Sequence, residues 1–256
     1  KNTLRTIAIS NDNFKFLGEN IKGIKNSGWP TSKIKIYSEK SKSLELFEFK
    51  NKNQNNFYLF KYITLFNLIK KNNDLKFIKL KNYDLDILNK RNYDLIINSE
   101  KNNLIIKKYF QKNIEKNYKS LAHTAIIDHK KVENKISKQI FTKNGPLAFL
   151  PLSNYQTSIV FSNYSIKLID KIDLLKIINK YNQEYKIVKI SKVESFSIKF
   201  LFPRNYIYKN ILSFGDLIHK VHPLAGQGFN MTIRDIKSLS SILDEDIKLG
   251  IDDGEL

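Results

Sequence analysis

The sequence contains no cysteine, and this absence excludes several kinds of chemistry. Disulfide bonds, thiolate metal sites and cysteine nucleophiles cannot form. Histidine is also scarce: the chain has four, of which His219 and His222 are close enough in sequence to suggest a metal pair. No third ligand has a clear place beside them, so we expect no metal site.

Long apolar runs are missing as well. No run reaches the ~18 residues that a membrane-spanning helix needs. The first residues, KNTLRTIAIS, lack the apolar core of a signal peptide. We therefore expect a cytoplasmic protein. Because the chain starts at Lys1 rather than at methionine, we also expect it to be a fragment or a processed product.

Arginine is rare, although the formal net charge is +19. The only arginines are Arg5, Arg91, Arg204 and Arg234, so nearly all of the positive charge comes from lysine. Nucleic-acid sites favour arginine, because its planar guanidinium reads phosphates and guanine edges. The abundance of Lys, Asn and Ile is instead typical of AT-rich codons. We expect no nucleic-acid partner, although the basic surface favours contact with anionic lipid at the periphery of the inner membrane.

The residues that are present predict a folded chain with a mixed architecture. Hydrophobic residues make up 41% of the 256 positions, which is enough for a real core. Apolar periodicity predicts helices at residues 62–71 and 169–182. Alternation predicts strands at residues 4–10, 33–38, 43–50, 75–80, 93–97, 124–127, 148–152, 157–161 and 195–202. Gly28, Trp29 and Pro30 predict a break. The order, α/β, then mainly antiparallel β, then α/β, suits two domains threaded through each other.

The most informative segment is GDLIHKVHPLAGQGFNMTIRD, residues 215–235. A predicted strand at 211–214 ends at Gly215 and Asp216, and a loop then leads to a helical pattern at 229–243. A glycine pair at a helix start lets a ligand approach bare N–H groups, and the helix end favours negative charge there. An acid that directly follows a strand is well placed to accept hydrogen bonds from ribose or ribitol hydroxyls.

This segment resembles the FAD-dependent aromatic-ring hydroxylases that share the fold of para-hydroxybenzoate hydroxylase. The run HPLAGQGFN, residues 222–230, followed by Arg234 and Asp235, is most similar to the ubiquinone-biosynthesis type. Residues 4–10, 28–29, 57–60 and 141–152 resemble further segments of the same family in the same order.

The resemblance implies an α/β (α+β) fold, in which an incomplete FAD-binding domain is interleaved with a mainly antiparallel substrate-binding sheet. Residues 1–30, 57–113 and 206–256 would belong to the FAD-binding domain, and residues 31–56 and 114–205 to the substrate domain. The family's N-terminal GxGxxG turn and its C-terminal end would be missing.

The resemblance also implies roles for particular residues. Asp216 would bind the flavin ribitol, Arg5 would contact the phosphates, and the loop from Pro223 to Gly226 would lie along the isoalloxazine ring. The backbone N–H groups near Gly228, Phe229 and Asn230 would face the flavin N1/O2 edge. The full predicted set for the cofactor is Arg5, Gly215, Asp216, Pro223, Gly226, Gln227, Gly228, Phe229 and Asn230. No catalytic side chain can be named.

The implied activity is a monooxygenase that uses FAD, NAD(P)H and O2 to hydroxylate an aromatic ring, in a polyprenylated phenol or quinol. Contact with a membrane or a ubiquinone-biosynthesis assembly would follow. One segment departs from the family pattern: Glu100 and Lys101 stand where an aspartate and a glycine are expected. This departure keeps open a degenerate, non-catalytic flavoprotein partner, and the shared Gly-Asp motif keeps open a related flavin-dependent reductase.

Overall fold

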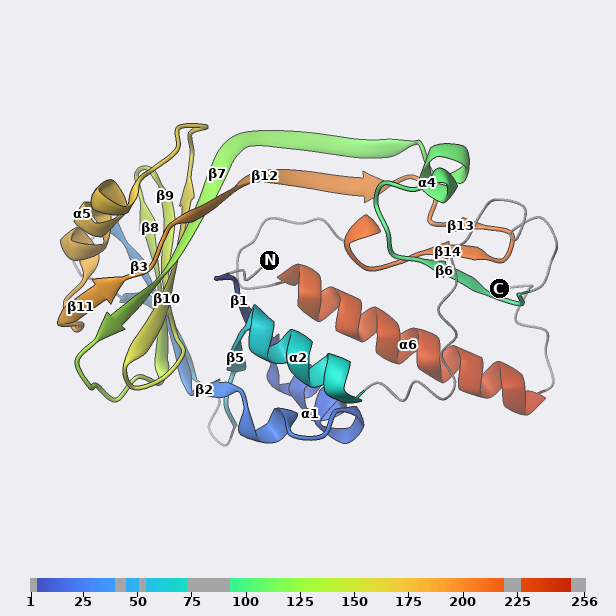
Figure 1. Ribbon diagram of the computed structural model, residues 1–256, viewed down its shortest axis with the longest axis horizontal. Helices are drawn as coiled ribbons and strands as arrows, with labels where there is room; N and C mark the ends of the chain where they lie inside the picture. The colour runs from blue at the N-terminus through green and yellow to red at the C-terminus, as the bar shows by residue number, and fades with distance from the viewer. Residues whose placement is uncertain (1–3, 40–44, 51–53, 73–92, 219–226, 250–256) are drawn as a thin grey trace. The chain divides into compact units, whose positions relative to one another are not determined.

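The computed structural model describes residues 4–39, 45–50, 54–72, 93–218 and 227–249 (Figure 1). The chain forms two compact units, one from Lys1–Asn72 with Tyr118–Ile198, the other from Asn73–Asn117 with Lys199–Leu256. The domain boundaries expected from the sequence stay a prediction. No helix within the described ranges is both long and apolar enough to cross a membrane.

The first unit contains a small antiparallel sheet in the order β1 (Thr6–Ser10), β5 (Phe57–Lys61) and β2 (Trp29–Thr31). Helix α1 (Asn11–Asn20) follows β1, η1 (Ile24–Asn26) precedes β2, and α2 (Tyr62–Asn72) follows β5. The predicted break at residues 28–30 is wrong, because Trp29 and Pro30 lie in β2. This strand is at the edge of the sheet, where proline is tolerated since its missing N–H has no partner strand.

The larger sheet of this unit follows the order β11-β7-β10-β9-β8-β3-β4, and β12 also pairs with β7. The strands are β3 (Lys33–Ser38), β4 (Glu45–Lys50), β7 (Asn113–His129), β8 (Ile136–Thr142), β9 (Gly145–Pro151), β10 (Gln156–Asn163), β11 (Ile187–Ile190) and β12 (Glu194–Pro203). Strand β3 is parallel to β8, whereas β8, β9, β10 and β7 form antiparallel pairs. Residues 113–117 of β7 and 199–203 of β12 belong to the second unit.

Helix α5 (Lys171–Tyr181) covers one face of this sheet and closes the main core. Leu174 and Ile178 of the helix pack with Phe149, Ile159 and Phe161 of the sheet, and all five are almost completely buried. The helix spans the predicted range 169–182 closely. Its N-terminal end is fixed by Asp170, whose side chain accepts from the N–H of Asp173 at 2.8 Å.

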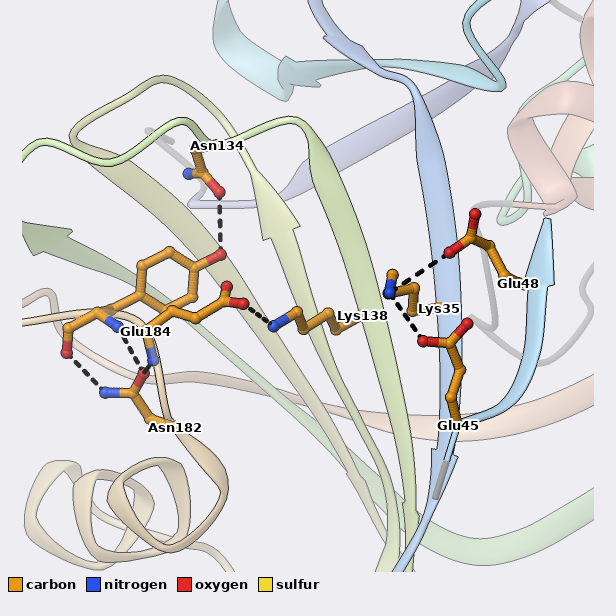
Figure 2. Close-up of polar contacts among 8 residues, drawn as sticks. Lys35, Glu45, Glu48, Asn134, Lys138, Asn182 and Glu184 are labelled. Carbon is orange, nitrogen blue, oxygen red and sulfur yellow. Dashed lines mark hydrogen bonds and ion pairs between the residues drawn. The ribbon is translucent and has the colours of Figure 1, made fainter. Parts of the chain in front are cut away.

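Polar side chains join this sheet to the segment that follows α5 (Figure 2). The Tyr185 hydroxyl donates to Asn134 Oδ1 at 2.9 Å, and Asn134 Nδ2 donates to Thr157 Oγ1 at 2.9 Å. Burial raises the pKa of Tyr185 to about 12. On the edge of the sheet, Lys35 contacts Glu45 at 2.8 Å and Glu48 at 3.4 Å.

The second unit is built on a sheet in the order β13 (Ile207–Tyr208), β14 (Ile211–Ser213) and β6 (Ile96–Asn98). Strands β14 and β6 are parallel. Helix α4 (Leu104–Tyr109) and the short η4 (Gly215–Leu217) follow β6 and β14, and the long α6 (Gln227–Leu249) comes last. The predicted helix at 229–243 is confirmed, and α6 is longer than predicted at both ends. The predicted strand at 93–97 is shifted toward the C-terminus and corresponds to β6. The predicted strand at 75–80 lies outside the described residues.

Candidate cofactor-binding site

The candidate site begins where β14 and β6 end. Ser213 is in register with Asn98, so the carboxyl ends of both strands meet at one edge of the sheet. The backbone N–H of Phe214 donates to the Asn98 carbonyl at 2.9 Å and prolongs the pairing by one step. In open parallel sheets, ligands bind outside the carboxyl ends of the strands. This edge is therefore the natural place for a cofactor.

Gly215 turns the chain away from β14. Its φ is +68°, in the left-handed region where a side chain is disfavoured, and the residue is buried. A Cβ at this position would lie 3.9 Å from Thr232 Cγ2, so the requirement for glycine comes from the backbone conformation rather than from space. Because Thr232 belongs to α6, this contact places the turn beside the first turns of that helix.

Asp216 follows the turn and is exposed, so its carboxylate is available to accept hydrogen bonds from a ligand. The N–H of Ile218 closes the turn on the Gly215 carbonyl at 3.0 Å. The buried Leu217 anchors the turn from the other side. Because its neighbours Gly215 and Leu217 are both buried, the backbone of the turn keeps the Asp216 carboxylate at the surface.

The N-terminal end of α6 lies in the same unit. N–H groups in the first turn of an α-helix have no intrahelical acceptor, and they carry the positive end of the helix dipole. Gln227 is exposed and Gly228 and Phe229 are half-buried, whereas Asn230 is 6% exposed and anchors the turn. Because η4 contacts α6, an acceptor group and a donor-rich helix end lie in one region of this unit.

The predicted cofactor residues do not all belong to the second unit. Arg5 lies in the other unit, where its guanidinium carbon is 4.9 Å from the centre of the Phe196 ring and its carbonyl accepts from Tyr62 N at 2.8 Å. The predicted contact of Arg5 with phosphates stays a prediction. Pro223 and Gly226 lie outside the described residues.

The connection from β6 to α4 contributes a polar cluster that sequence reasoning missed. Asn103 caps α4 by accepting from Ile106 N at 3.0 Å, and its Nδ2 donates to Asn98 Oδ1 at 2.5 Å. The signal was present, because asparagine is a preferred N-cap residue. Lys101 in this connection does not have a positive φ, so the position does not require the left-handed conformation that glycine allows.

Two buried polar atoms at this edge have no hydrogen-bond partner among the described residues. They are Asn98 Nδ2 and Ser213 Oγ, whose residues are 4% and 1% exposed. Buried donors and acceptors are normally satisfied, so such atoms point to a missing polar partner. Together with the glycine turn, the exposed acid and the helix end, they fit a ligand rich in hydroxyl and phosphate groups.

Metal chemistry has no comparable support. Within the part of the chain that the structure describes, no group of three or more His, Cys, Asp or Glu side chains could hold a metal ion. His219 and His222 lie outside the described residues. His123, treated as an ordinary polar position in the sequence, is completely buried in β7, with its Nδ1 2.7 Å from Ser195 Oγ.

Sequence comparison finds relatives among ubiquinone-biosynthesis enzymes. The chain is 28% identical to the ubiquinone biosynthesis monooxygenase COQ6 of Dictyostelium discoideum, in a match that covers 46% of this chain and 31% of that protein. It is 30% identical over 111 residues to the 3-demethoxyubiquinol 3-hydroxylase of Escherichia coli, which is 41% of this chain and 28% of that protein. The matches span about a third of each relative. No protein-family model matches the chain.

Comparison with solved structures establishes the fold. The chain is similar to PqsL, a probable FAD-dependent monooxygenase from Pseudomonas aeruginosa, with a TM-score of 0.72 and 14% identity over 97% of this chain and 78% of that chain. The predicted fold class is confirmed, because the chain has the fold of these monooxygenases. The resemblance to ubiquinone-biosynthesis hydroxylases is confirmed by the relatives that bear those names.

Proposed function

We propose that this chain binds FAD and takes part in a monooxygenase reaction that hydroxylates an aromatic ring with NAD(P)H and O2. The observation that carries the proposal is the turn at Gly215 and Asp216, which directly follows a parallel strand and packs beside the start of α6. The names of the sequence relatives and the shared fold support it.

Each part of the site has a role in this proposal. Asp216 accepts hydrogen bonds from the ribitol hydroxyls, and the backbone at Gly228 lets the flavin ring approach the helix. The N–H groups from Gly228 to Asn230 and the positive end of the helix dipole stabilise negative charge on the N1/O2 edge of the ring. FAD, when bound, supplies the redox chemistry; the protein positions the rings and limits access of water.

The substrate class comes from the relatives, whose names place them in ubiquinone biosynthesis. We propose a polyprenylated phenol or quinol, bound against the large sheet. Such a molecule reaches the protein from a membrane, so contact with a membrane surface or with a biosynthetic assembly belongs to the same proposal.

The test is a titration of the full-length protein with FAD, followed by visible absorbance, for the natural sequence and Asp216→Ala. Loss of a hydrogen bond to a charged group costs about 2 kcal/mol, so affinity should fall roughly 30-fold. Asp244→Ala is the matched control, because Asp244 is an exposed acid near the other end of α6. Equal affinity in Asp216→Ala and the natural protein would contradict the role of Asp216.

Two further outcomes separate the alternatives. Oxygen uptake coupled to substrate hydroxylation supports the monooxygenase and excludes the flavin-dependent reductase. A full-length protein that binds no FAD would overturn the proposed enzyme activity and favour a non-catalytic partner in the pathway.

A further inference from the structure

The large sheet of the first unit has two faces of different character. Ala125, Ile159 and Phe149 point to one face and belong to the core that α5 closes. Their neighbours along each strand point the other way, because side chains alternate across a sheet. On this second face, one residue from each strand between β7 and β4 lies in register with the next: Thr124, Val160, Ala148, Gln139, Ile36 and Phe47. We call this line of residues the β7–β4 row.

The β7 end of the row carries two unpaired hydroxyl groups. Ser158 of β10 faces Ile126, which is two residues from Thr124 in β7, so Ser158 and Thr124 share the second face. Thr124 is 3% exposed and Ser158 is 0% exposed, and neither hydroxyl oxygen has a hydrogen-bond partner among the described residues. Buried hydroxyls are normally satisfied, and each can both donate and accept. Two adjacent ones fit a single polar group, such as the oxygen of a phenol or quinol.

The β4 end of the row is apolar. Phe47 and Phe49 are 63% and 54% exposed, and their rings stack with centroids 6.5 Å apart. Ile36, in register with Phe47, continues the apolar surface into β3. Glu48 lies between the two phenylalanines and points to the opposite face, where its carboxylate is 3.4 Å from Lys35 Nζ (Figure 2). Strand β4 therefore keeps its charges on one face and two aromatic rings on the other.

The middle of the row is narrow in side-chain size and partly open. Val160 and Ala148 are half-buried, and Gln139, also half-buried, contributes its aliphatic stem beside them. Neighbouring strands lie ~4.8 Å apart, so the row spans about 24 Å from Thr124 to Phe47. An aromatic ring alone is too short to reach both ends. A ring that carries a long apolar chain is long enough.

Charged and amide groups close the second face in one direction along the strands. Gln156 faces Asp128 in register, one step beyond Ser158 on the same face. Gln156 Nε2 donates to Asp128 Oδ1 at 2.7 Å, and Lys61 Nζ donates to Gln156 Oε1 at 2.6 Å. An apolar chain placed over these groups would strip water from them without replacing its hydrogen bonds. The favourable path from the hydroxyl pair is therefore across the strands, toward β4.

We propose that the β7–β4 row binds an aromatic compound with a long apolar chain, with its ring oxygen at Thr124 and Ser158 and its chain directed to Phe47 and Phe49. This inference rests on the proposed function and deepens it by assigning the residues that determine specificity. Thr124 and Ser158 recognise the oxygen, whereas Phe47 and Phe49 recognise the far part of the chain.

The test titrates the full-length protein, with and without FAD, with para-ethylphenol and para-dodecylphenol in a calorimeter, below the concentrations at which the probes form micelles. A fully buried methylene favours binding roughly fourfold, and a half-covered one about twofold. The longer probe should therefore bind on the order of 1,000-fold more tightly than the shorter one.

Phe47→Ser with Phe49→Ser tests the chain end. Each ring should contribute roughly fivefold by covering the chain, so the double variant should bind para-dodecylphenol roughly 25-fold more weakly and para-ethylphenol as well as the natural protein does. Ile166→Ser with Ile172→Ser is the matched control, because these residues are 74% and 65% exposed and lie just before and within α5, on the other side of the sheet. It should leave both affinities unchanged.

Ser158→Ala tests the oxygen end. The hydroxyl has no partner in the free protein, so its removal should leave thermal stability unchanged or higher. Loss of its hydrogen bond to the probe should weaken both phenols equally, by roughly fivefold, and should leave para-dodecylbenzene unaffected. A structural role for Ser158 would instead lower the stability and leave the preference for the phenol over the benzene intact.

Several outcomes would overturn the proposal. They are an equal loss for both phenols in the phenylalanine variant, an equal loss in the isoleucine control, and no preference for the longer probe. Self-association that the phenylalanine variant abolishes, with probe binding unchanged, would make β4 an interface between copies instead. Failure of the proposed function is distinguishable, because a protein that binds FAD but does not discriminate between the probes contradicts only the assignment of the row.

Discussion

The backbone N–H of Phe214 donates to the carbonyl of Asn98 at 2.9 Å, and this bond joins two segments that are far apart in the sequence. It aligns the end of β14 with the end of β6, so that the turn at Gly215 and the polar connection to α4 share one edge of the sheet. The candidate site depends on that alignment.

Gly215→Ala should disturb this edge. An alanine forced to a φ of +68° costs on the order of 1–2 kcal/mol, and relief of the strain would move Asp216. We expect a lower free energy of unfolding in urea together with weaker binding of FAD. Gly228→Ala is the informative comparison, because alanine inside the first turn of α6 should stabilise the helix by up to about 1 kcal/mol while a methyl group obstructs the ligand. Equal stability of Gly215→Ala and the natural protein would contradict the conformational argument.

Asn103→Ala should destabilise the β6–α4 connection. The substitution removes the N-cap of α4. It also removes the amide that donates to Asn98 Oδ1, and Asn98 is a buried residue. We expect a loss of about 1–2 kcal/mol in the free energy of unfolding. Asn102→Ala changes the neighbouring, exposed asparagine and should have little effect. If Asn103→Ala and Asn102→Ala are equally stable, the side chain of Asn103 does not stabilise the β6–α4 connection.

Tyr185→Phe tests the buried polar network of the larger unit. Without the hydroxyl, Asn134 Oδ1 loses a donor at 2.9 Å in a buried position, which costs about 1–3 kcal/mol. Tyr155→Phe is the control, since Tyr155 is 54% exposed.

The pKa of Tyr185 is raised from 10.0 to about 12, so its contribution to stability is complete below pH 10 and is lost as pH rises toward 12. An unfolding titration over alkaline pH should show a larger loss in the natural protein than in Tyr185→Phe, because Tyr37 and Tyr181, whose pKa values burial also raises, titrate in both proteins.

His123 should make the larger unit sensitive to acid. Its side chain is completely buried, and burial lowers its pKa below the ordinary value of 6.5. The folded state therefore favours the neutral ring, and stability falls as the pH drops through 6.5, because unfolded chains bind the proton more readily. His123→Gln cannot titrate, so its free energy of unfolding should change less between neutral pH and about pH 5. Parallel pH profiles for the two proteins would show that His123 is not the group responsible.

The sequence by itself determined the local elements and the chemistry of the motif. Apolar spacing located α2, α5 and α6, and alternation located β3, β9 and β10, because these patterns follow from the geometry of one helix or one strand. The contiguous segment from Gly215 to Asp235 indicated a candidate cofactor-binding site through its resemblance to the flavin-dependent hydroxylases, because such a motif can be recognised along the chain. The break predicted at Trp29 and Pro30 failed, since local turn signals do not reveal a partner strand such as β5.

Only the tertiary structure decided which of these segments meet. The parallel pairing of β14 with β6, the hydrogen bond from Asn103 to Asn98, and the stacking of Tyr109 on Tyr208 all join residues whose relation no local pattern records. Burial acts in the same way: His123 and Tyr185 have ordinary sequence surroundings, and their pKa values shift because the packed sheet removes water from them. Periodicity is a property of a single element, whereas pairing, desolvation and strain arise when elements from distant parts of the chain pack together.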